Sequence, residues 1–251
     1  MARSINFNTA DMSTYGLVVT SPGANLLGQL VSHIQLQDRG YAFRPMREPR
    51  RIIVGYSVTG TSLANLDANL DAIKRILTLT EPKKLIFDSL STRYFNAVLE
   101  SLEGEYRHAT LFQGKLEFIC PDPLGYNITE DDHDHSINTN PKTIDEAVAG
   151  TGYIAPVYTL TAKNTLTGAT IKVENLTTEE ELVWVGDLAI DGTLVIDVER
   201  WLVSKGVTVD MATVTGEFPR LKPNVTNQIK ITGLWVSVTG NLNILYRDTY
   251  L

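Results

Sequence analysis

The chain has 251 residues, a formal net charge of −7 and a hydrophobic fraction of 43%. This length allows one large domain or two small ones, and the hydrophobic fraction excludes a wholly disordered chain. The net negative charge argues against a protein that coats nucleic acid, because binding to phosphates requires a basic face.

A basic stretch covers residues 39–51, where five arginines surround Pro45 and Pro49. We interpret it as an extended, proline-stiffened arm whose guanidinium groups engage acidic partner surfaces. A solvated loop between strands explains the same residues equally well. The candidate interface residues of this stretch are Arg44, Arg47, Arg50 and Arg51.

The next residues predict a strand followed by a helix. Residues 52–58 are β-branched and aromatic, as is typical of a strand, and Ser62 offers a side-chain oxygen for a helix N-cap. Five apolar residues then follow at spacings of three and four, which predicts an amphipathic helix with one buried face. They are Leu63, Leu66, Leu70, Ile73 and Leu77. Pro82 ends the pattern.

Short strands are predicted at residues 84–87, 94–99 and 110–119, so the first part of the chain is expected to be an α+β sheet with one helix on it. Cys120 follows the last of these strands and is the only cysteine, which excludes an intrachain disulfide. We interpret it as a buried, unreactive side chain. Neither a signal peptide nor an apolar run long enough for a membrane span is found, so we expect no membrane association.

Residues 129–141 differ sharply from their surroundings. One of these thirteen residues is apolar, and the segment ends in Asn140-Pro141, a turn signal. The charge also changes here: residues 1–128 carry 13 basic and 12 acidic side chains, whereas residues 129–251 carry 9 and 17. We predict an exposed connector between two domains, with the N-terminal domain at residues 1–135, a linker at 136–151 and the C-terminal domain at 152–251.

This segment also holds a polar cluster, Asp131-Asp-His133-Asp-His135. Two imidazoles flanked by carboxylates can bind a divalent metal, so His133 and His135 are candidate metal ligands. A metal site needs a rigid frame, however, and a connector supplies none. A solvated linker is therefore the favoured interpretation.

From residue 152 onward, strand-like runs recur at short intervals between turn residues. About eight strands in a hundred residues are typical of a β-sandwich or jelly roll. Thr239-Gly-Asn241 joins two alternating runs, which predicts a terminal hairpin. The segment Glu179-Glu-Glu181 is interpreted as a solvated loop.

The sequence contains no phosphate loop, no dinucleotide fingerprint and no nucleophile elbow, so we expect neither an enzyme nor a cofactor. Trp184 and Trp201 are candidates for stacking on sugar rings, although tryptophans of a sandwich more often pack in its core.

The order of several short motifs along the chain resembles the distal tail protein (Dit) family of long-tailed, non-contractile bacteriophages. The resemblance spans about residues 5–251. Its landmarks are Phe7, Tyr15-Gly-Leu17, Arg50-Arg-Ile-Ile-Val54, Gly60-Thr-Ser62, Arg93-Tyr-Phe-Asn-Ala-Val98, Phe118-Ile-Cys-Pro-Asp-Pro123, Tyr126, Ile190-Asp191, Gly216-Glu-Phe-Pro-Arg-Leu221 and Tyr246-Arg-Asp-Thr-Tyr-Leu251.

This resemblance implies a structural protein of the virion, made in the host cytoplasm and placed at the tail tip. Members of the family form a homo-hexameric ring between the tail tube protein and the tail-associated tip protein, and DNA passes through the lumen without specific binding. The N-terminal domain would build the ring. A galectin-like C-terminal β-sandwich would project outward, where receptor-binding proteins are further candidate partners.

The sequence departs from the family at Lys222-Pro-Asn-Val-Thr-Asn227, where relatives usually have Pro-Gly ahead of an asparagine. Without a glycine, Asn224 or Asn227 must occupy any turn position with a positive φ. The sugar signature of true galectins, His-x-Asn-Pro-Arg, is also absent from the sequence. Two other functions remain open: a carbohydrate-binding module of the tail tip that contacts the host envelope, and a tail-tip hydrolase.

Overall fold

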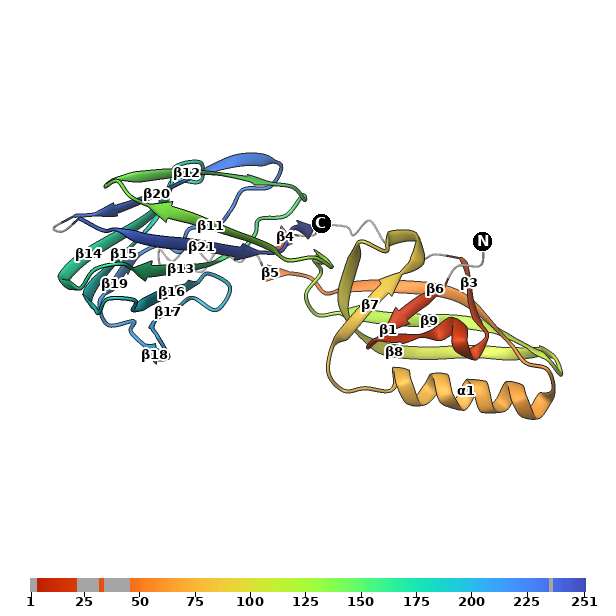
Figure 1. The fold of residues 1–251 in the computed structure, drawn as a ribbon. Coiled ribbons are helices and arrows are strands. Elements are labelled where there is room, and N and C mark those ends of the chain that lie inside the picture. The colour runs from red at the N-terminus through yellow and green to blue at the C-terminus, as the bar shows by residue number, and fades with distance from the viewer. Residues whose placement is uncertain (1–3, 22–31, 34–45, 235–236) are drawn as a thin grey trace. The chain divides into compact units, whose positions relative to one another are not determined.

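The computed structural model describes residues 4–21, 32–33, 46–234 and 237–251 (Figure 1). It divides into two compact units, one of residues 1–128 with Leu251 and one of residues 129–250. Each unit has its own hydrophobic core. Most described residues lie in strands and α1 is the one α-helix among them, so the predicted mainly-β class is confirmed.

The first unit is built on one antiparallel sheet with the strand order β2-β1-β7-β8-β9-β6-β3, and β10 also pairs with β8. Its strands are β1 (Ile5–Phe7), β2 (Ala10–Asp11), β3 (Leu17–Ser21), β6 (Arg50–Thr59), β7 (Lys83–Phe87), β8 (Arg93–His108), β9 (Leu111–Cys120) and β10 (Gly125–Asn127). Two 3-10 helices, η1 (Met12–Tyr15) and η2 (Asp88–Leu90), lie between strands, and β4 (Ser32–His33) pairs with β5 (Met46–Arg47).

Helix α1 (Leu63–Leu77) covers one face of this sheet (Figure 1). It begins where the sequence predicts, because the Ser62 hydroxyl accepts a hydrogen bond from the Asn65 amide at 3.2 Å. Of the predicted apolar stripe, Leu66, Leu70 and Ile73 are buried. Leu63, in the first turn, is half exposed. The amphipathic pattern thus identified both the helix and its packing face.

Strand β8 is much longer than the predicted run of residues 94–99. Its pairing with β7 ends at Ala97, while its pairing with β9 continues to His108. Beyond Ala97, no other described strand pairs with the edge of β8 that faces away from β9. Within the described residues, the backbone groups on this side of the segment thus have no strand partner and form a border of the sheet.

The second unit is a sandwich of a six-stranded sheet, β11-β21-β13-β16-β17-β18, and a five-stranded sheet, β12-β20-β14-β15-β19. The six-stranded sheet contains β11 (Asp131–Ile137), β13 (Val157–Ala162), β16 (Thr193–Asp197), β17 (Leu202–Lys205), β18 (Thr208–Val209) and β21 (Gly240–Tyr246). The five-stranded sheet contains β12 (Lys142–Val148), β14 (Leu166–Asn175), β15 (Glu180–Leu188), β19 (Val214–Gly216) and β20 (Val225–Gly233). The last strand, β22, is Thr249–Tyr250. Buried side chains from both sheets form a single core.

The prediction of a connector is wrong, because this segment forms the first two strands of the sandwich. Strand β11 pairs with β21 from Asp131 to Ile137, and β12 pairs with β20 over all seven of its residues. The boundary thus lies at residue 128, not 135, and residues 136–151 are not a linker. The segment is polar because β11 is an edge strand whose inward face carries His133 and His135 instead of apolar side chains.

The predicted terminal hairpin is also wrong. Strand β20 pairs with β12 and β14, whereas β21 pairs with β11 and β13 in the other sheet. The segment between them therefore crosses from one sheet of the sandwich to the other.

None of the helices in the described part of the chain is long and apolar enough to cross a membrane.

Candidate functional site

The four candidate interface arginines do not share one environment. Arg44 lies outside the described residues, and Arg47 lies in β5, where only the backbone is described. Arg50 and Arg51 belong to β6, and strand alternation turns their side chains to opposite faces. Arg50 and Arg51 are thus part of the sheet rather than of an extended arm, because β6 begins at Arg50.

Arg50 is buried, and its guanidinium carbon lies 5.2 Å from the centre of the Phe95 ring. Burial lowers the pKa of Arg50, and the nearby Cys120 and Asp122 partly offset this effect. A side chain in this position packs inside the unit, which corrects its assignment as an interface residue. Arg51 remains exposed on the opposite face.

Arg51 forms ion pairs across two neighbouring strands. Its guanidinium lies 3.0 Å from Glu117 Oε1 on β9 and 3.2 Å from Glu100 Oε1 on β8. The side chain is nevertheless 59% exposed. Arg51 is thus the one candidate of the four that the structure describes as accessible to a partner.

The two candidate metal ligands lie on β11 and face a buried carboxylate. Glu146, on β12 of the opposite sheet, accepts a hydrogen bond from His133 Nδ1 and lies 3.2 Å from His135 Nε2. Its side chain is 2% exposed. Among the described residues, no group of three or more histidine, cysteine, aspartate or glutamate side chains is arranged to hold a metal ion. In this geometry both imidazoles contact the Glu146 carboxylate.

The two candidate sugar-stacking tryptophans differ completely in exposure. Trp184 is fully buried in the core, and its indole nitrogen donates a hydrogen bond to Asp210 Oδ2 at 3.0 Å. Its ring has no free face, which removes it as a sugar-stacking residue. Trp201, between β16 and β17, is 48% exposed and packs on Phe218 with 5.6 Å between the ring centres.

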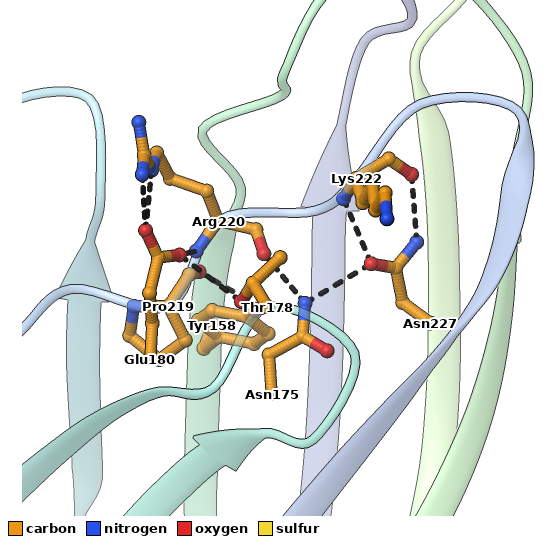
Figure 2. Close-up of polar contacts among 8 residues, drawn as sticks. All are labelled: Tyr158, Asn175, Thr178, Glu180, Pro219, Arg220, Lys222 and Asn227. Atoms are coloured by element: carbon orange, nitrogen blue, oxygen red, sulfur yellow. Dashed lines mark hydrogen bonds and ion pairs between the residues drawn. The ribbon is translucent and has the colours of Figure 1, made fainter.

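A polar network close to Phe218 fixes the segment that leads into β20 (Figure 2). The carboxylate of Glu180 accepts from the Arg220 amide at 2.7 Å, from Arg220 Nε at 2.7 Å and from Arg220 Nη2. Glu180 is buried and Arg220 is about one-third exposed. The interpretation of residues 179–181 as a solvated loop is therefore wrong for Glu180.

The same network continues through two fully buried asparagines (Figure 2). Asn175 Nδ2 donates to the Arg220 carbonyl at 2.6 Å and to Asn227 Oδ1 at 3.0 Å. Asn227 in turn binds both the amide and the carbonyl of Lys222. These bonds close the turn that contains Asn224. Asn224 has a φ of 55°, so of the two candidate asparagines it is the one that occupies the positive-φ position.

Sequence reasoning missed the two buried carboxylates because their partners are distant in the chain. Glu180 and Arg220 are 40 residues apart, and Glu146 follows His133 by 13 residues. The only local signal was Arg220 itself, a charged residue inside the apolar landmark Phe218-Pro-Arg-Leu221. Such a residue requires a compensating acid when its neighbours are buried.

Neither a protein-family model nor a curated protein sequence matches the chain. The fold, however, matches the crystal structure of the SPP1 Dit protein (gp 19.1), described as a paradigm of the hub adsorption apparatus in phages that infect Gram-positive bacteria. The match covers 100% of both chains with a TM-score of 0.75 and 15% sequence identity. The chain thus has the two-part fold of that Dit protein, as the resemblance implied.

Two structures of the phage p2 baseplate in its activated conformation, with calcium and with strontium, are also similar. The first has 13% identity, 98% coverage of both chains and a TM-score of 0.47. The second has 11% identity, 99% coverage and a TM-score of 0.48.

Proposed function

We propose that this chain is a structural protein of a phage virion that acts as a distal tail protein. Six copies form a ring at the distal end of a long, non-contractile tail, where the ring joins the tail tube protein to the tail-associated tip protein. The observation that carries this proposal is the full-length match to SPP1 Dit at a TM-score of 0.75, which includes both units in the same order.

The first unit supplies the features that a ring subunit needs. A closed ring requires a heterologous contact in which one border of a subunit meets a different surface of the next. The free edge of β8 beyond Ala97 offers backbone groups for such a contact, and the exposed Arg51 offers a charged one. The role requires no catalytic group and no cofactor.

The test is the mass of the assembled protein. We expect size-exclusion chromatography with light scattering, performed with the tube and tip proteins present, to give a particle containing about six chains of 27.8 kDa. Negative-stain microscopy should show it as a ring. A chain that stays monomeric with both partners present would refute the proposal.

A matched pair of variants tests the contribution of Arg51. Arg51→Glu reverses the charge of an exposed, ion-paired arginine in the first unit, and we expect it to reduce the fraction of rings. Arg200→Glu makes the same change in the second unit, where Arg200 is paired with Asp197 at 3.7 Å. We expect the Arg200 variant to form rings normally, because the ring is built by the first unit.

The alternative function, a carbohydrate-binding module that contacts the host envelope, is supported by one observation: the half-exposed ring of Trp201. An exposed indole can stack on the apolar face of a pyranose ring. Binding of the full-length protein to purified host cell walls that is lost in Trp201→Ala would support this function. Equal binding by the variant would exclude a role of this ring.

A further inference from the structure

The segment from Phe218 to Arg220 in the second unit contacts two partly exposed aromatic rings, those of Trp201 and Tyr153. Trp201 packs on Phe218, and two residues further on the Arg220 guanidinium carbon lies 5.1 Å from the centre of the Tyr153 ring. Trp201 is 48% exposed and Tyr153 is 44% exposed. We call Trp201, Phe218, Arg220 and Tyr153 the aromatic strip.

A frame of hydrogen bonds and an ion pair holds the segment that carries Arg220 of the aromatic strip (Figure 2). The Tyr158 hydroxyl donates to the Pro219 carbonyl at 3.1 Å, and the Arg220 carbonyl accepts from the buried Asn175. The Glu180 carboxylate holds the guanidinium of Arg220 through both Nε and Nη2. A partner that binds here therefore loses little side-chain entropy on the side of this protein, because Arg220 is ordered in advance.

The composition of the aromatic strip is that of a protein-binding centre. Tryptophan, tyrosine and arginine are the residues that most often dominate the binding energy of protein interfaces. Trp201 also has a φ of 58°, a left-handed conformation that is strained for a bulky residue. The fold thus keeps a large aromatic ring at the surface in a strained conformation.

The charges around the aromatic strip indicate the chemistry of the partner. Arg220 is neutralised by Glu180 and Arg200 is paired with Asp197. Three exposed carboxylates lie within two residues, along the chain, of the strip or its frame, and none of them forms an ion pair in the described part of the chain. They are Glu179, Glu199 and Glu217. By the same criteria there is one exposed cation without an ion pair, Lys222. The exposed, unpaired charges that neighbour the strip and its frame along the chain are thus mainly acidic, which favours a basic partner and disfavours an anionic polymer.

We propose that the aromatic strip is the docking site for a basic segment of another protein of the same virion. Trp201 and Tyr153 provide aromatic faces for apolar groups and for lysine or arginine, and the three carboxylates attract the cations around them. This inference rests on the proposed function, since it supplies the outward contact of a tail-tip subunit.

Site-specific photo-cross-linking in intact virions tests this proposal and identifies the partner in the same experiment. A benzophenone amino acid is introduced at Arg200, which borders the strip and has a 78% exposed side chain. The control position is Thr143, an exposed residue on edge strand β12 of the other sheet. We expect Arg200 to cross-link to a peptide of another virion protein with an excess of lysine and arginine, with at least about tenfold higher yield than Thr143.

Two variants distinguish the outcomes. The first variant combines Trp201→Ala with Tyr153→Ala, and the second combines Glu199→Lys with Glu217→Lys. Each should lower the cross-link yield by about tenfold. An unchanged melting temperature shows that the unit is still folded. Virions that assemble normally but give no cross-link, or only one to an acidic peptide, would overturn this inference and leave the ring function intact. Cross-links to cell-wall saccharide alone would also overturn it.

Discussion

The hydroxyl of Tyr246 donates a hydrogen bond to Glu146 Oε1 at 3.0 Å, although the two residues belong to opposite sheets of the sandwich. Burial, followed by the neighbouring Glu146 charge, raises the pKa of Tyr246, so the phenol remains a donor. His133 and His135 complete the set of donors around this carboxylate. A buried carboxylate is tolerated here because three side chains from the facing sheet replace its lost contacts with water.

Replacing Tyr246 by phenylalanine should therefore destabilise the second unit. Hydrogen bonds to charged groups are worth about 1.5–3 kcal/mol, and the buried carboxylate would lose one of its donors. Urea denaturation should show a corresponding loss in the free energy of unfolding. Tyr153→Phe is the control, because the ring of Tyr153 is half exposed; equal stability of the two variants would contradict the role of the Glu146 contact.

Two other buried tyrosines should respond in opposite ways to the same change. The Tyr56 hydroxyl is buried without a hydrogen-bond partner in the described part of the chain, and burial raises the pKa of Tyr56 to about 12. Tyr56→Phe should leave stability unchanged or increase it by about 1 kcal/mol, since an unsatisfied group is removed. Tyr158→Phe removes a bond to Pro219 and should cost about 1 kcal/mol. Thermal unfolding of both variants checks the difference in sign.

Cys120 should be unreactive in the folded protein. Burial raises the pKa of this thiol from 9.0 to about 12, with a partial offset from Arg50. Because only the thiolate attacks disulfides, Ellman's reagent at pH 8 should label Cys120 only after unfolding. Because burial raises the pKa of Cys120, the neutral buried thiol contributes to the free energy of unfolding. This contribution is fully present below about pH 9 and is lost as the pH rises toward 12. Rapid labelling of native protein would disprove the assignment.

Substitutions of Asn224 should separate backbone conformation from side-chain contacts. The residue is exposed and has a φ of 55°. Asn224→Gly should keep or slightly raise stability, whereas Asn224→Ala should lower it by about 1 kcal/mol, because only glycine adopts this region without strain. Chemical denaturation of both variants provides the measurement. A more stable alanine variant would show that the turn does not depend on left-handed backbone.

The two tryptophans should show the contrast in their environments as a difference in stability. Trp184→Ala leaves a cavity in the core and removes the indole donor of Asp210 Oδ2, and should cost about 3–5 kcal/mol. Trp201→Ala removes a half-exposed ring and should change stability by less than about 1 kcal/mol. Differential scanning calorimetry of both variants checks this order. A large loss for Trp201→Ala would show that the ring serves packing more than docking.

The parts of the fold that follow from local patterns were predictable from the sequence. Ser62 and the apolar stripe after it define α1, because capping and periodicity depend only on neighbouring residues. Strand β11 was missed because its inward histidines become intelligible only beside Glu146 on another strand. The pairing of Glu180 with Arg220 has the same cause: it joins residues brought together by the folded chain alone.

The exposure of the two tryptophans was only partly accessible from the sequence. In β15, Leu182 and Trp184 alternate with more exposed residues, a pattern that indicates an inward-facing indole. Trp201 sits in a turn, where alternation gives no information. Its orientation depends on Phe218, which arrives from a distant segment of the chain.

The borders of the two units have different consequences for self-association. A second copy that added a strand to β11 would bring its backbone against Asp132 and Asp134, and addition to β12 would disturb the inward charge of Glu146. Both borders therefore resist open-ended growth of the sandwich into fibres. The edge of β8 beyond Ala97 carries no such inward charge, because Glu103 and Glu105 are exposed. At high protein concentration, copies of the chain are thus expected to associate through the first unit rather than through the second.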